Sequence, residues 1–500
     1  MSGQAILAID QGTTSSRAIV FSAEDGEIIA LSQKELTLYY PHKGWVEQDA
    51  HDIWRDTLET MGEALGQAAK LDYQVKVAGI TNQRETTIIW DRETGEPIYN
   101  AIVWQDRRTG PYCQALKDQG LEERIADKTG LLLDPYFSAS KITWILDNVE
   151  GARAKAESGA LAFGTVECFL LWRLTKGQVH ATDASNASRT MLMNIQTGQW
   201  DDELLEIFTI PKALLPEIKD NVGNFGDIAA EYCTALNGQA LPIGGMAGDQ
   251  QAALIGQACF DRGMVKSTYG TGCFVLMNMG EEFKRSDNRL LTTVAYQLEG
   301  KITYALEGSI FVAGAAMQWL RDNVGFFTHA SESEALALSV EDSNGVYFVP
   351  AFTGLGAPYW APEAKAAILG LSRESNKAHI TRAALEAQAY QTQDLMAAFS
   401  ADSGADIVTM RCDGGLVANE FMCQYLADII NTDVELPKIT ETTALGAAYL
   451  AGLSVGLYTG LDDIAARWQC AKAYAPNMDE ATRQEALTGW KHSIGQVLLT

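Results

Sequence analysis

The chain has 500 residues, of which 47% are hydrophobic and 20% are charged, the proportions of an ordinary globular protein. This length exceeds what one hydrophobic core supports, so we expect two domains, residues 1–250 and 251–500. The formal net charge of −26 favours solubility and argues against a nucleic-acid partner, which would require basic surface.

The sequence also excludes several cellular settings and metal sites. No apolar stretch is long enough for a transmembrane helix, and the N-terminus lacks the basic segment of a signal peptide. The eight cysteines are scattered without a CxxC pair, and the six histidines form no HxxH or HExxH pattern. We therefore expect a cytoplasmic protein with reduced thiols.

Residues 6–21, ILAIDQGTTSSRAIVF, predict a strand, a tight turn and a second strand. The turn contains Gly12, which lets backbone amides approach a ligand closely, followed by four hydroxyl residues. Asp10, at the end of the first strand, could hold a hydrated magnesium ion beside an anion. We interpret this hairpin as a candidate nucleotide-phosphate site, although an ordinary polar turn with a capping aspartate has the same pattern.

The rest of the first half predicts an α/β domain with a mixed sheet. A third strand is expected over 27–31, and a helix capped by Asp49 follows with helical apolar spacing. Further strands are expected over 75–80 and 87–91, and helices alternate with loops from about 150 to 245. The glycine-rich residues 241–249, LPIGGMAGD, predict a hinge between the two halves.

A helix is expected over 250–257, and the second half then repeats the strand and turn pattern of the first half. A strand over 264–268, a tight turn over 269–272 and a strand over 273–277 resemble the first hairpin. Strands over 292–298 and 301–306 come next, with helices at about 309–322, 378–400, 417–431 and 442–453. Two such loops in two lobes would hold ATP between them.

The remaining motifs restrict how ATP could be bound. The chain lacks a P-loop, a GxGxxG fingerprint, the protein-kinase motifs and a GxSxG elbow, so the hairpin loops must bind any nucleotide. Residues 412–419, CDGGLVAN, predict a glycine-rich turn after a strand, from which Asn419 could reach an adenine edge. A plain strand–helix connector is the alternative for this segment, as a plain tight turn is for Gly270-Thr271-Gly272.

Three further features could bind and activate a hydroxyl compound. Asp249 stands at a predicted helix start, either as a general base or as a simple helix cap. Residues 81–86, TNQRET, contain Arg84 and Glu85, which suit a polyol but also suit a surface turn with a salt bridge. Three aromatic residues lie near these loops in sequence: Trp104, Tyr136 and Phe274. They could form the walls of a binding site or belong to the hydrophobic core.

Six segments, in order along nearly the whole chain, resemble the FGGY carbohydrate kinases, and in particular the members that act on glycerol. They are DQGTTSSR (10–17), YFSASKITWILDN (136–148), GDQQAAL (248–254), YGTGCF (269–274), GAAMQWLRD (314–322) and GLVANEFMCQYLADIINTDVELP (415–437). The resemblance implies an actin-like fold, with two ribonuclease-H-like domains facing a central cleft. It also implies magnesium-dependent transfer of the ATP γ-phosphoryl group to glycerol, giving sn-glycerol 3-phosphate, and a homodimer or homotetramer.

The resemblance carries site roles onto matched positions. The implied glycerol site contains Arg84, Glu85, Trp104, Tyr136, Asp249, Gln250 and Phe274, with Asp249 as general base. The implied nucleotide site contains Thr13, Thr14, Ser15, Arg17, Thr271, Gly314, Gln318, Gly415 and Asn419, with Asp10 serving magnesium.

Two other functions remain open at this point. A kinase of the same family could act on a ketose or a larger polyol, although such relatives usually carry a different loop, often ending Met-His-Gly, where this chain has Gln83-Arg84-Glu85-Thr86. An ATPase like actin or Hsp70 could share the fold, since a fold does not fix a function. Such a protein would not need the Arg84–Glu85 pair.

Overall fold

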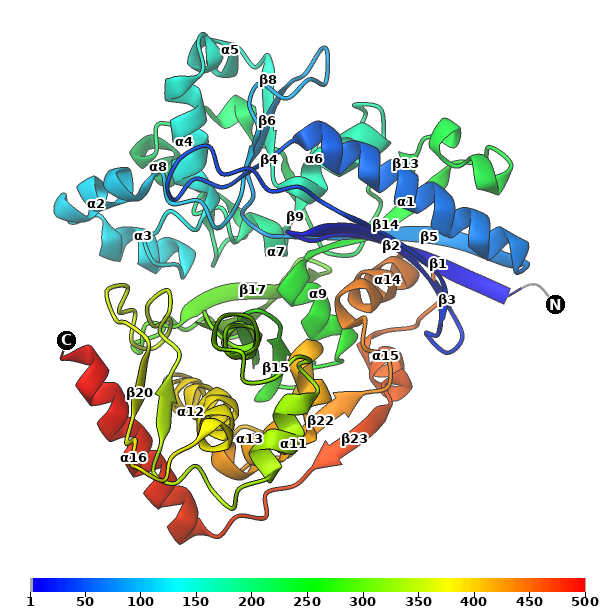
Figure 1. Cartoon of the computed structure of the whole chain (residues 1–500). Helices are drawn as coiled ribbons and strands as arrows, with labels where there is room; N and C mark the ends of the chain where they lie inside the picture. Colours follow the sequence, from blue (N-terminus) through cyan, green and yellow to red (C-terminus); the bar gives the residue numbers. More distant parts are fainter. Residues whose placement is uncertain (1–2, 500) are drawn as a thin grey trace.

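The computed structural model describes residues 3–499, which form two α/β domains, shown one above the other in Figure 1. The upper domain is built on a six-stranded sheet with the order β13-β14-β5-β1-β2-β3. Its strands are β1 (Gly3–Gln11), β2 (Ser15–Ser22), β3 (Ile28–Glu35), β5 (Tyr73–Asn82), β13 (Asp227–Ile228) and β14 (Leu241–Gly248).

The lower domain is built on a seven-stranded sheet with the order β17-β18-β16-β15-β21-β22-β23. Its strands are β15 (Met264–Tyr269), β16 (Cys273–Gly280), β17 (Leu291–Leu298), β18 (Lys301–Ile310), β21 (Thr409–Asp413), β22 (Val434–Pro437) and β23 (Cys470–Tyr474). Short strands pair elsewhere: β4 (Glu47–Gln48), β6 (Ile88–Asp91), β7 (Ala101–Ile102), β8 (Leu161–Gly164), β9 (Ala181–Asp183), β10 (Met193–Asn194), β11 (Gln199–Trp200), β12 (Glu217–Lys219), β19 (Tyr347–Val349) and β20 (Ala367–Leu369).

Helices surround both sheets. They are α1 (Ala50–Lys70), α2 (Gly110–Asp118), α3 (Glu122–Thr129), α4 (Ser138–Asn148), α5 (Ala152–Glu157), α6 (Val166–Leu174), α7 (Ala184–Ala187), α8 (Asp202–Ile207), α9 (Asp249–Gly256), α10 (Gly314–Trp319), α11 (Glu332–Leu338), α12 (Lys377–Ser403), α13 (Glu420–Ile430), α14 (Thr442–Ser454), α15 (Leu461–Arg467) and α16 (Glu480–Leu498). No helix within residues 3–499 combines the length and the apolar character needed to cross a lipid bilayer.

The two sheets share one topology. In the upper sheet, β1, β2 and β3 form antiparallel neighbours, while β5 and β14 add parallel to β1 and to each other. In the lower sheet, β15, β16 and β18 pair antiparallel, while β21 and β22 add in parallel. This duplicated ribonuclease-H-like arrangement confirms the predicted actin-like two-domain fold.

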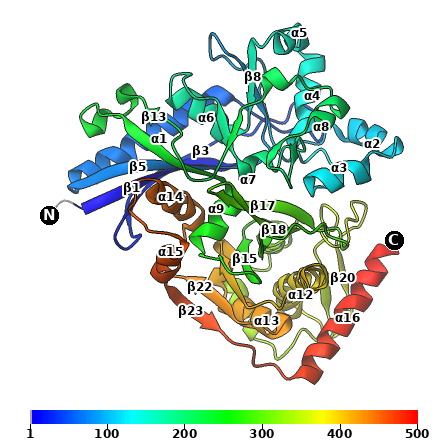
Figure 2. The ribbon, with the colours of Figure 1, turned by 180° about the vertical axis from the view of Figure 1, so that it is seen from behind.

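The domains meet through two helices stacked between the sheets, so the molecule is layered. Helix α1 covers the outer face of the upper sheet and α14 its inner face, as Figure 2 shows from behind. Helix α9 covers the inner face of the lower sheet and packs directly against α14, while α12 lies on the far side. Alternate residues of β1 therefore enter two cores, Leu7 facing α1 and Ile6 facing α14.

Glycines allow these layers to approach at backbone distance. A Cβ atom added at Gly446 of α14 would lie 1.8 Å from the carbonyl oxygen of Ala252, and one at Gly256 of α9 would lie 1.9 Å from that of Thr442. Gly245 of β14 faces the backbone of α14 in the same way, with Ala451 N at 2.6 Å. The prediction of a glycine-rich hinge over 241–249 is therefore wrong: the segment is a buried strand, and its glycines make room for α14.

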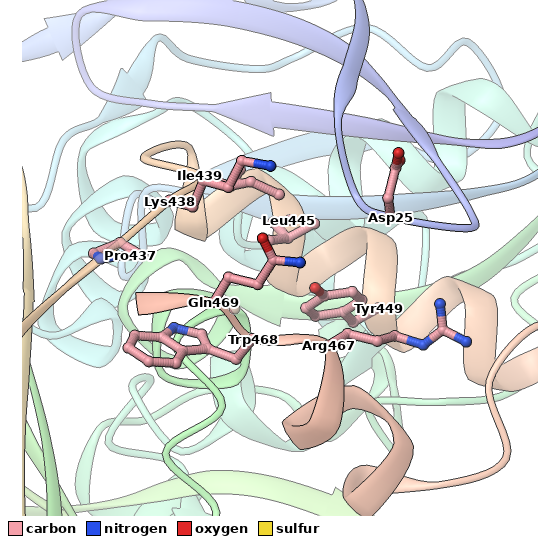
Figure 3. Close-up of a pocket in the computed structure, with 10 residues that line it drawn as sticks. Asp25, Pro437, Lys438, Ile439, Leu445, Tyr449, Arg467, Trp468 and Gln469 are labelled. Atoms are coloured by element: carbon pink, nitrogen blue, oxygen red, sulfur yellow. The ribbon is translucent and has the colours of Figure 1, made fainter. Parts of the chain in front are cut away.

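A second contact between the domains lies at the turn between β2 and β3. Figure 3 shows a small hollow lined by Asp25 of this turn and by Lys438, Tyr449 and Arg467. Arg467 Nη1 donates to the carbonyl oxygen of Glu24 at 2.6 Å, and Lys438 Nζ lies 3.3 Å from Glu27 Oε1.

Most predicted elements are present, with shifted ends. The hairpin over 6–21, the helix capped by Asp49 and the strand–turn–strand over 264–277 are confirmed. The Asp49 carboxylate accepts from His51 N at 2.8 Å. The helix predicted at 309–322 begins only at Gly314, because β18 continues to Ile310.

We predict that Gly446→Ala destabilises the protein because the methyl group forces α9 and α14 apart. Overpacking of this kind lowers the free energy of unfolding by about 1–3 kcal/mol, to be measured by urea denaturation. The matched control is Gly62→Ala in α1, where nothing lies within 4 Å of the added Cβ atom. That variant should be neutral or stabilised by up to about 1 kcal/mol, since alanine favours helices. Equal effects of the two changes would contradict the packing described for α9 and α14.

Candidate functional site

The first loop, residues 10–17, is a tight turn held by its own backbone. Gly12 N donates to Ser15 O at 2.9 Å, which leaves the side chains of Thr13, Thr14 and Ser15 around the turn. Asp10 is buried, and its Oδ2 pairs with Nη2 of Arg17. The other terminal nitrogen of Arg17 reaches Glu441 Oε2, at the start of α14, at 2.6 Å.

The second loop, residues 269–272, is braced against the start of α10. Gly270 N donates to Gly272 O at 2.8 Å, and Gly314 N donates to Gly270 O at 2.9 Å. The side chain of Thr271 remains exposed beside this backbone crossing. Gly314 could not carry a Cβ atom here, which would lie 2.7 Å from Gly270 O.

The third loop, residues 412–419, packs on the second. Gly414 has φ of +96°, and a Cβ atom there would lie 2.4 Å from Tyr269 O. Asn419 caps α13, with its Oδ1 accepting from Met422 N at 2.9 Å and its Nδ2 donating to Ser333 Oγ at 3.3 Å. Gly415 and Gln318 lie exposed nearby in the lower domain. Both polar atoms of Asn419 are thus engaged within the protein.

The loop over 81–86 is buried, so the reading of this segment as a surface turn is wrong. All six of its residues are shielded from solvent. Asn82 Nδ2 donates to Glu167 Oε2 at 2.7 Å, and Gln83 Nε2 donates to Gln48 Oε1 at 2.7 Å. Glu85 has φ of +61°, a strained conformation that persists only where its surroundings enforce it.

Arg84 is the centre of the contacts around this loop. Its Nη1 and Nη2 bind Glu307 Oε2 and Oε1 at 2.5 and 3.1 Å, a bidentate pair. Its Nε lies 3.2 Å from Asp249 Oδ1, and Nη1 also donates to Gln251 Oε1 at 3.2 Å. The hydroxyl of Tyr136 lies 3.5 Å from Nη2 and is its loosest partner.

Asp249 begins α9, as predicted, and faces both domains. Its Oδ1 accepts from Gln250 N at 2.7 Å, whereas its Oδ2 carries no hydrogen bond from the described residues. The side chain retains 31% of its surface. Burial raises the pKa of Asp249, while Arg84 and Lys266 oppose that rise. Lys266, buried in β15, donates to Gln250 Oε1 at 2.5 Å and so fixes that side chain.

Two charged residues that the sequence analysis missed complete a charged cluster of Arg84, Glu85, Arg189 and Glu307. Arg189 follows α7, and its Nε donates to Glu85 Oε1 at 2.6 Å while its Nη2 donates to Glu307 Oε1 at 2.9 Å. Glu307 lies on β18, in the lower domain. The available signal was a charge within an apolar strand, since carboxylates are rarely buried without a partner.

The two carboxylates of the charged cluster respond differently to burial. Burial raises the pKa of Glu85 in spite of the nearby Arg189 and Arg84. For Glu307, burial acts in the same direction, but attraction from Arg189 and Arg84 outweighs it and lowers the pKa. The reason is geometric, because Glu307 is hydrogen-bonded by both guanidinium groups and Glu85 by only one.

The three predicted aromatic residues meet beside the charged cluster. Trp104 contacts Tyr136 and Phe274 edge-to-face, with ring centroids 5.5 and 6.1 Å apart. All three are only half-buried, so they form an apolar wall rather than core. The indole Nε1 of Trp104 also donates to Thr13 Oγ1 at 2.9 Å, which ties this wall to the first loop.

The carboxylates of the site could bind magnesium only together with water molecules and substrate phosphates. No group of three or more His, Cys, Asp or Glu side chains among residues 3–499 could enclose a metal ion. Magnesium, however, usually keeps several waters and binds one or two carboxylates together with substrate phosphates. Asp10, beside the first loop and close enough to Asp249 to influence its pKa, fits that mode.

The structure thus gathers Arg84, Glu85, Asp249, Gln250 and the aromatic wall around one point at the domain boundary. The first loop joins this group through Trp104 and Thr13. The second and third loops pack on each other in the lower domain, with Gln318 and Gly415 on its surface.

Comparisons with known proteins agree with this architecture. The N-terminal domain model of the FGGY family of carbohydrate kinases matches residues 5–256, and the C-terminal domain model matches residues 265–455. A glycerol kinase of Nitrosomonas eutropha is 61% identical, over 99% of this chain and 98% of its own. A glycerol kinase of Alcanivorax borkumensis is 56% identical, with the same shares covered.

Solved structures give the same result. The crystal structure of Plasmodium falciparum glycerol kinase with ADP superposes with a TM-score of 0.94 at 38% identity, covering 100% of this chain and 99% of that one. The ligand-bound xylulose kinase of Lactobacillus acidophilus, 23% identical, gives a TM-score of 0.89 over 99% of this chain and 98% of that one, a likeness of fold. This chain therefore belongs to the FGGY family of carbohydrate kinases.

Proposed function

We propose that this protein catalyses the ATP-dependent phosphorylation of glycerol to sn-glycerol 3-phosphate. The observation that carries the proposal is the convergence of Arg84, Glu85 and Asp249 on an apolar wall that is hydrogen-bonded to a phosphate-type loop. High identity to glycerol kinases over nearly the full chain supports the same conclusion.

The free atoms of the site suit a small triol. Glu85 Oε2 and Asp249 Oδ2 accept no hydrogen bond from residues 3–499, so each can accept one from a substrate hydroxyl. The Nη2 of Arg84 keeps its bond to Glu307 Oε1, and its other N–H, which reaches the Tyr136 hydroxyl only at 3.5 Å, can donate to a second hydroxyl. Trp104 and Phe274 then pack on the carbon backbone and limit the size of the acceptor.

The nucleotide is assigned to the three loops. Thr13, Thr14, Ser15 and Arg17 would contact the phosphates from the upper domain, with Thr271 and Gly314 opposite them. Gln318, Gly415 and Asn419 would line the rest of the nucleotide site. Asp10 would hold magnesium, which when bound neutralises charge on the phosphates.

In the proposed mechanism the protein mainly positions the reactants, as is usual in phosphoryl transfer. Arg84 Nε and Gln250 N hold Oδ1 of Asp249, which leaves Oδ2 to take the proton of the attacking hydroxyl. Burial raises the pKa of Asp249 and so increases its proton affinity as a general base. Attraction from Arg84 and Lys266 opposes this rise in the pKa of Asp249.

The decisive experiment measures ADP release by the purified protein with ATP and magnesium, with and without glycerol. We expect strong stimulation by glycerol and little by xylulose or gluconate. A larger response to a ketose would assign the chain to another acceptor. ATP turnover that no polyol or sugar stimulates would instead favour an ATPase like actin or Hsp70.

We predict that Asp249→Asn lowers kcat by about 10² or more, the range of general-base contributions. Glycerol binding, measured by calorimetry, should change only a few-fold, since asparagine can still accept from Gln250 N. Asp147→Asn, at an exposed ion pair with Arg153, serves as the control and should keep its activity. Near-normal turnover of Asp249→Asn would remove Asp249 from the role of base.

We also predict that Trp104→Phe separates the two substrates. Phenylalanine preserves the apolar wall but cannot donate to Thr13, so KM for ATP should rise about two- to tenfold, the effect of one lost neutral hydrogen bond. KM for glycerol should stay within about twofold. Trp172→Phe is the matched control, because the Trp172 indole nitrogen makes no hydrogen bond within residues 3–499. A rise confined to KM for glycerol would show that the hydrogen bond to Thr13 has no functional effect.

A further inference from the structure

Glu307 is a buried carboxylate that the proposed chemistry does not use. It lies on β18 of the lower domain with a side chain only 1% exposed, and it faces the upper domain. Both of its oxygens bind Arg84, and Oε1 also accepts from Arg189. The upper domain thus places two guanidinium groups around one carboxylate of the lower domain.

The contact between Arg84 and Glu307 does more than neutralise two charges, because its geometry also fixes the orientation of Arg84. Arg84 is planar and presents parallel donors, so a bidentate carboxylate fixes both the position and the plane of its guanidinium. With Nη1 and Nη2 held by Glu307, the Nε of Arg84 lies 3.2 Å from Asp249 Oδ1, an ion-pair contact. The orientation of the proposed base therefore depends on a residue that it does not touch.

Arg189 links Glu307 to a second residue of the site through hydrogen bonds. Its Nε holds Glu85 Oε1 while its Nη2 holds Glu307 Oε1, so Glu85 and Arg84 are fixed from the same carboxylate. The guanidinium of Arg189 is fully buried over the rings of Tyr136 and Phe137, and its Nη1 has no partner within residues 3–499. An unpaired buried donor destabilises a fold, which indicates that this arrangement serves the site rather than stability.

We propose that Glu307 is a positioning residue of the acceptor site, which holds Arg84 against Asp249 and, through Arg189, holds Glu85 against the polyol. The proposal rests on the proposed function and adds that the acceptor site is complete only when the lower domain supplies Glu307. Glycerol itself contacts Arg84, Glu85 and Asp249, and Glu307 acts through them.

The test is Glu307→Gln, assayed for KM of glycerol, KM of ATP and kcat. The amide keeps the size of the side chain but offers one acceptor oxygen instead of two, so it cannot hold Arg84 in a bidentate pair. We expect KM for glycerol to rise about tenfold or more, the effect of losing a hydrogen bond to a charged group, with a fall in kcat. KM for ATP should stay within about twofold. Equal rises in both KM values, or unchanged kinetics with reduced thermal stability, would overturn the proposal.

Two further variants separate positioning from the cost of an unpaired buried charge. Glu386→Gln breaks a buried ion pair with Arg382 inside α12, and it should leave both KM values unchanged. Arg189→Gln combined with Glu307→Gln removes one charge of each sign and keeps the test valid if the single variant does not fold. This double variant should still bind glycerol poorly; recovery to the wild-type KM would mean that charge balance alone is required.

The unmodified protein separates this proposal from the proposed function. Absence of glycerol-stimulated ADP release in the wild type would defeat both. Stimulation in the wild type, together with an unchanged KM for glycerol in Glu307→Gln, would defeat only the role of Glu307.

Discussion

The ion pair between Arg84 and Glu307 is the contact on which the site depends. It joins the loop after β5 of the upper domain to β18 of the lower domain, with both side chains almost fully buried. Burying two charges costs several kcal/mol per ion, and the attraction between them offsets this only when the geometry is good. Here the pair is bidentate, Arg189 adds a third contact, and the Nε of Arg84 lies 3.2 Å from Asp249 Oδ1. The pair therefore keeps Arg84 within reach of both other carboxylates, with its Nε 3.9 Å from Glu85 Oε1 and 3.2 Å from Asp249 Oδ1.

The layered fold brings these partners within reach. Helices α9 and α14 touch through Gly256 and Gly446, so the two sheets are separated only by this closely packed helix pair. The same close approach lets Arg17 of β2 reach Glu441 and lets Asp249 face Lys266. Any movement of one domain relative to the other must alter the distances from Arg84 to Glu307 and from Arg17 to Glu441, because both pairs cross the boundary. Substrate sites and domain arrangement are thus linked by two specific ion pairs rather than by a diffuse surface.

Local sequence patterns predicted the secondary structure well, because strand alternation and turn chemistry act over a few residues. They recovered both hairpins, the Asp49 cap and the start of α9, and family resemblance supplied the two-domain fold. They misjudged residues 241–249, because a glycine that admits a neighbouring helix has the same sequence signature as a glycine that frees a hinge. They also misjudged 81–86, whose polar side chains are buried against partners such as Glu167 and Gln48. Arg189 and Glu307 were not predicted, because their role depends on contacts between residues that are far apart in sequence. Glu85 and Arg189 are separated by 104 residues, and Arg84 and Glu307 by 223.

A double-mutant cycle on Arg84 and Glu307 tests the central claim most directly. The values of kcat/KM for glycerol are compared for Arg84→Gln, Glu307→Gln, the double variant and the wild type. If the two residues act as one unit across the domain boundary, the double variant loses little more than the worse single variant, and the coupling free energy exceeds about 1 kcal/mol. Losses that add to within about 0.5 kcal/mol, as for distant and independent residues, would contradict the account.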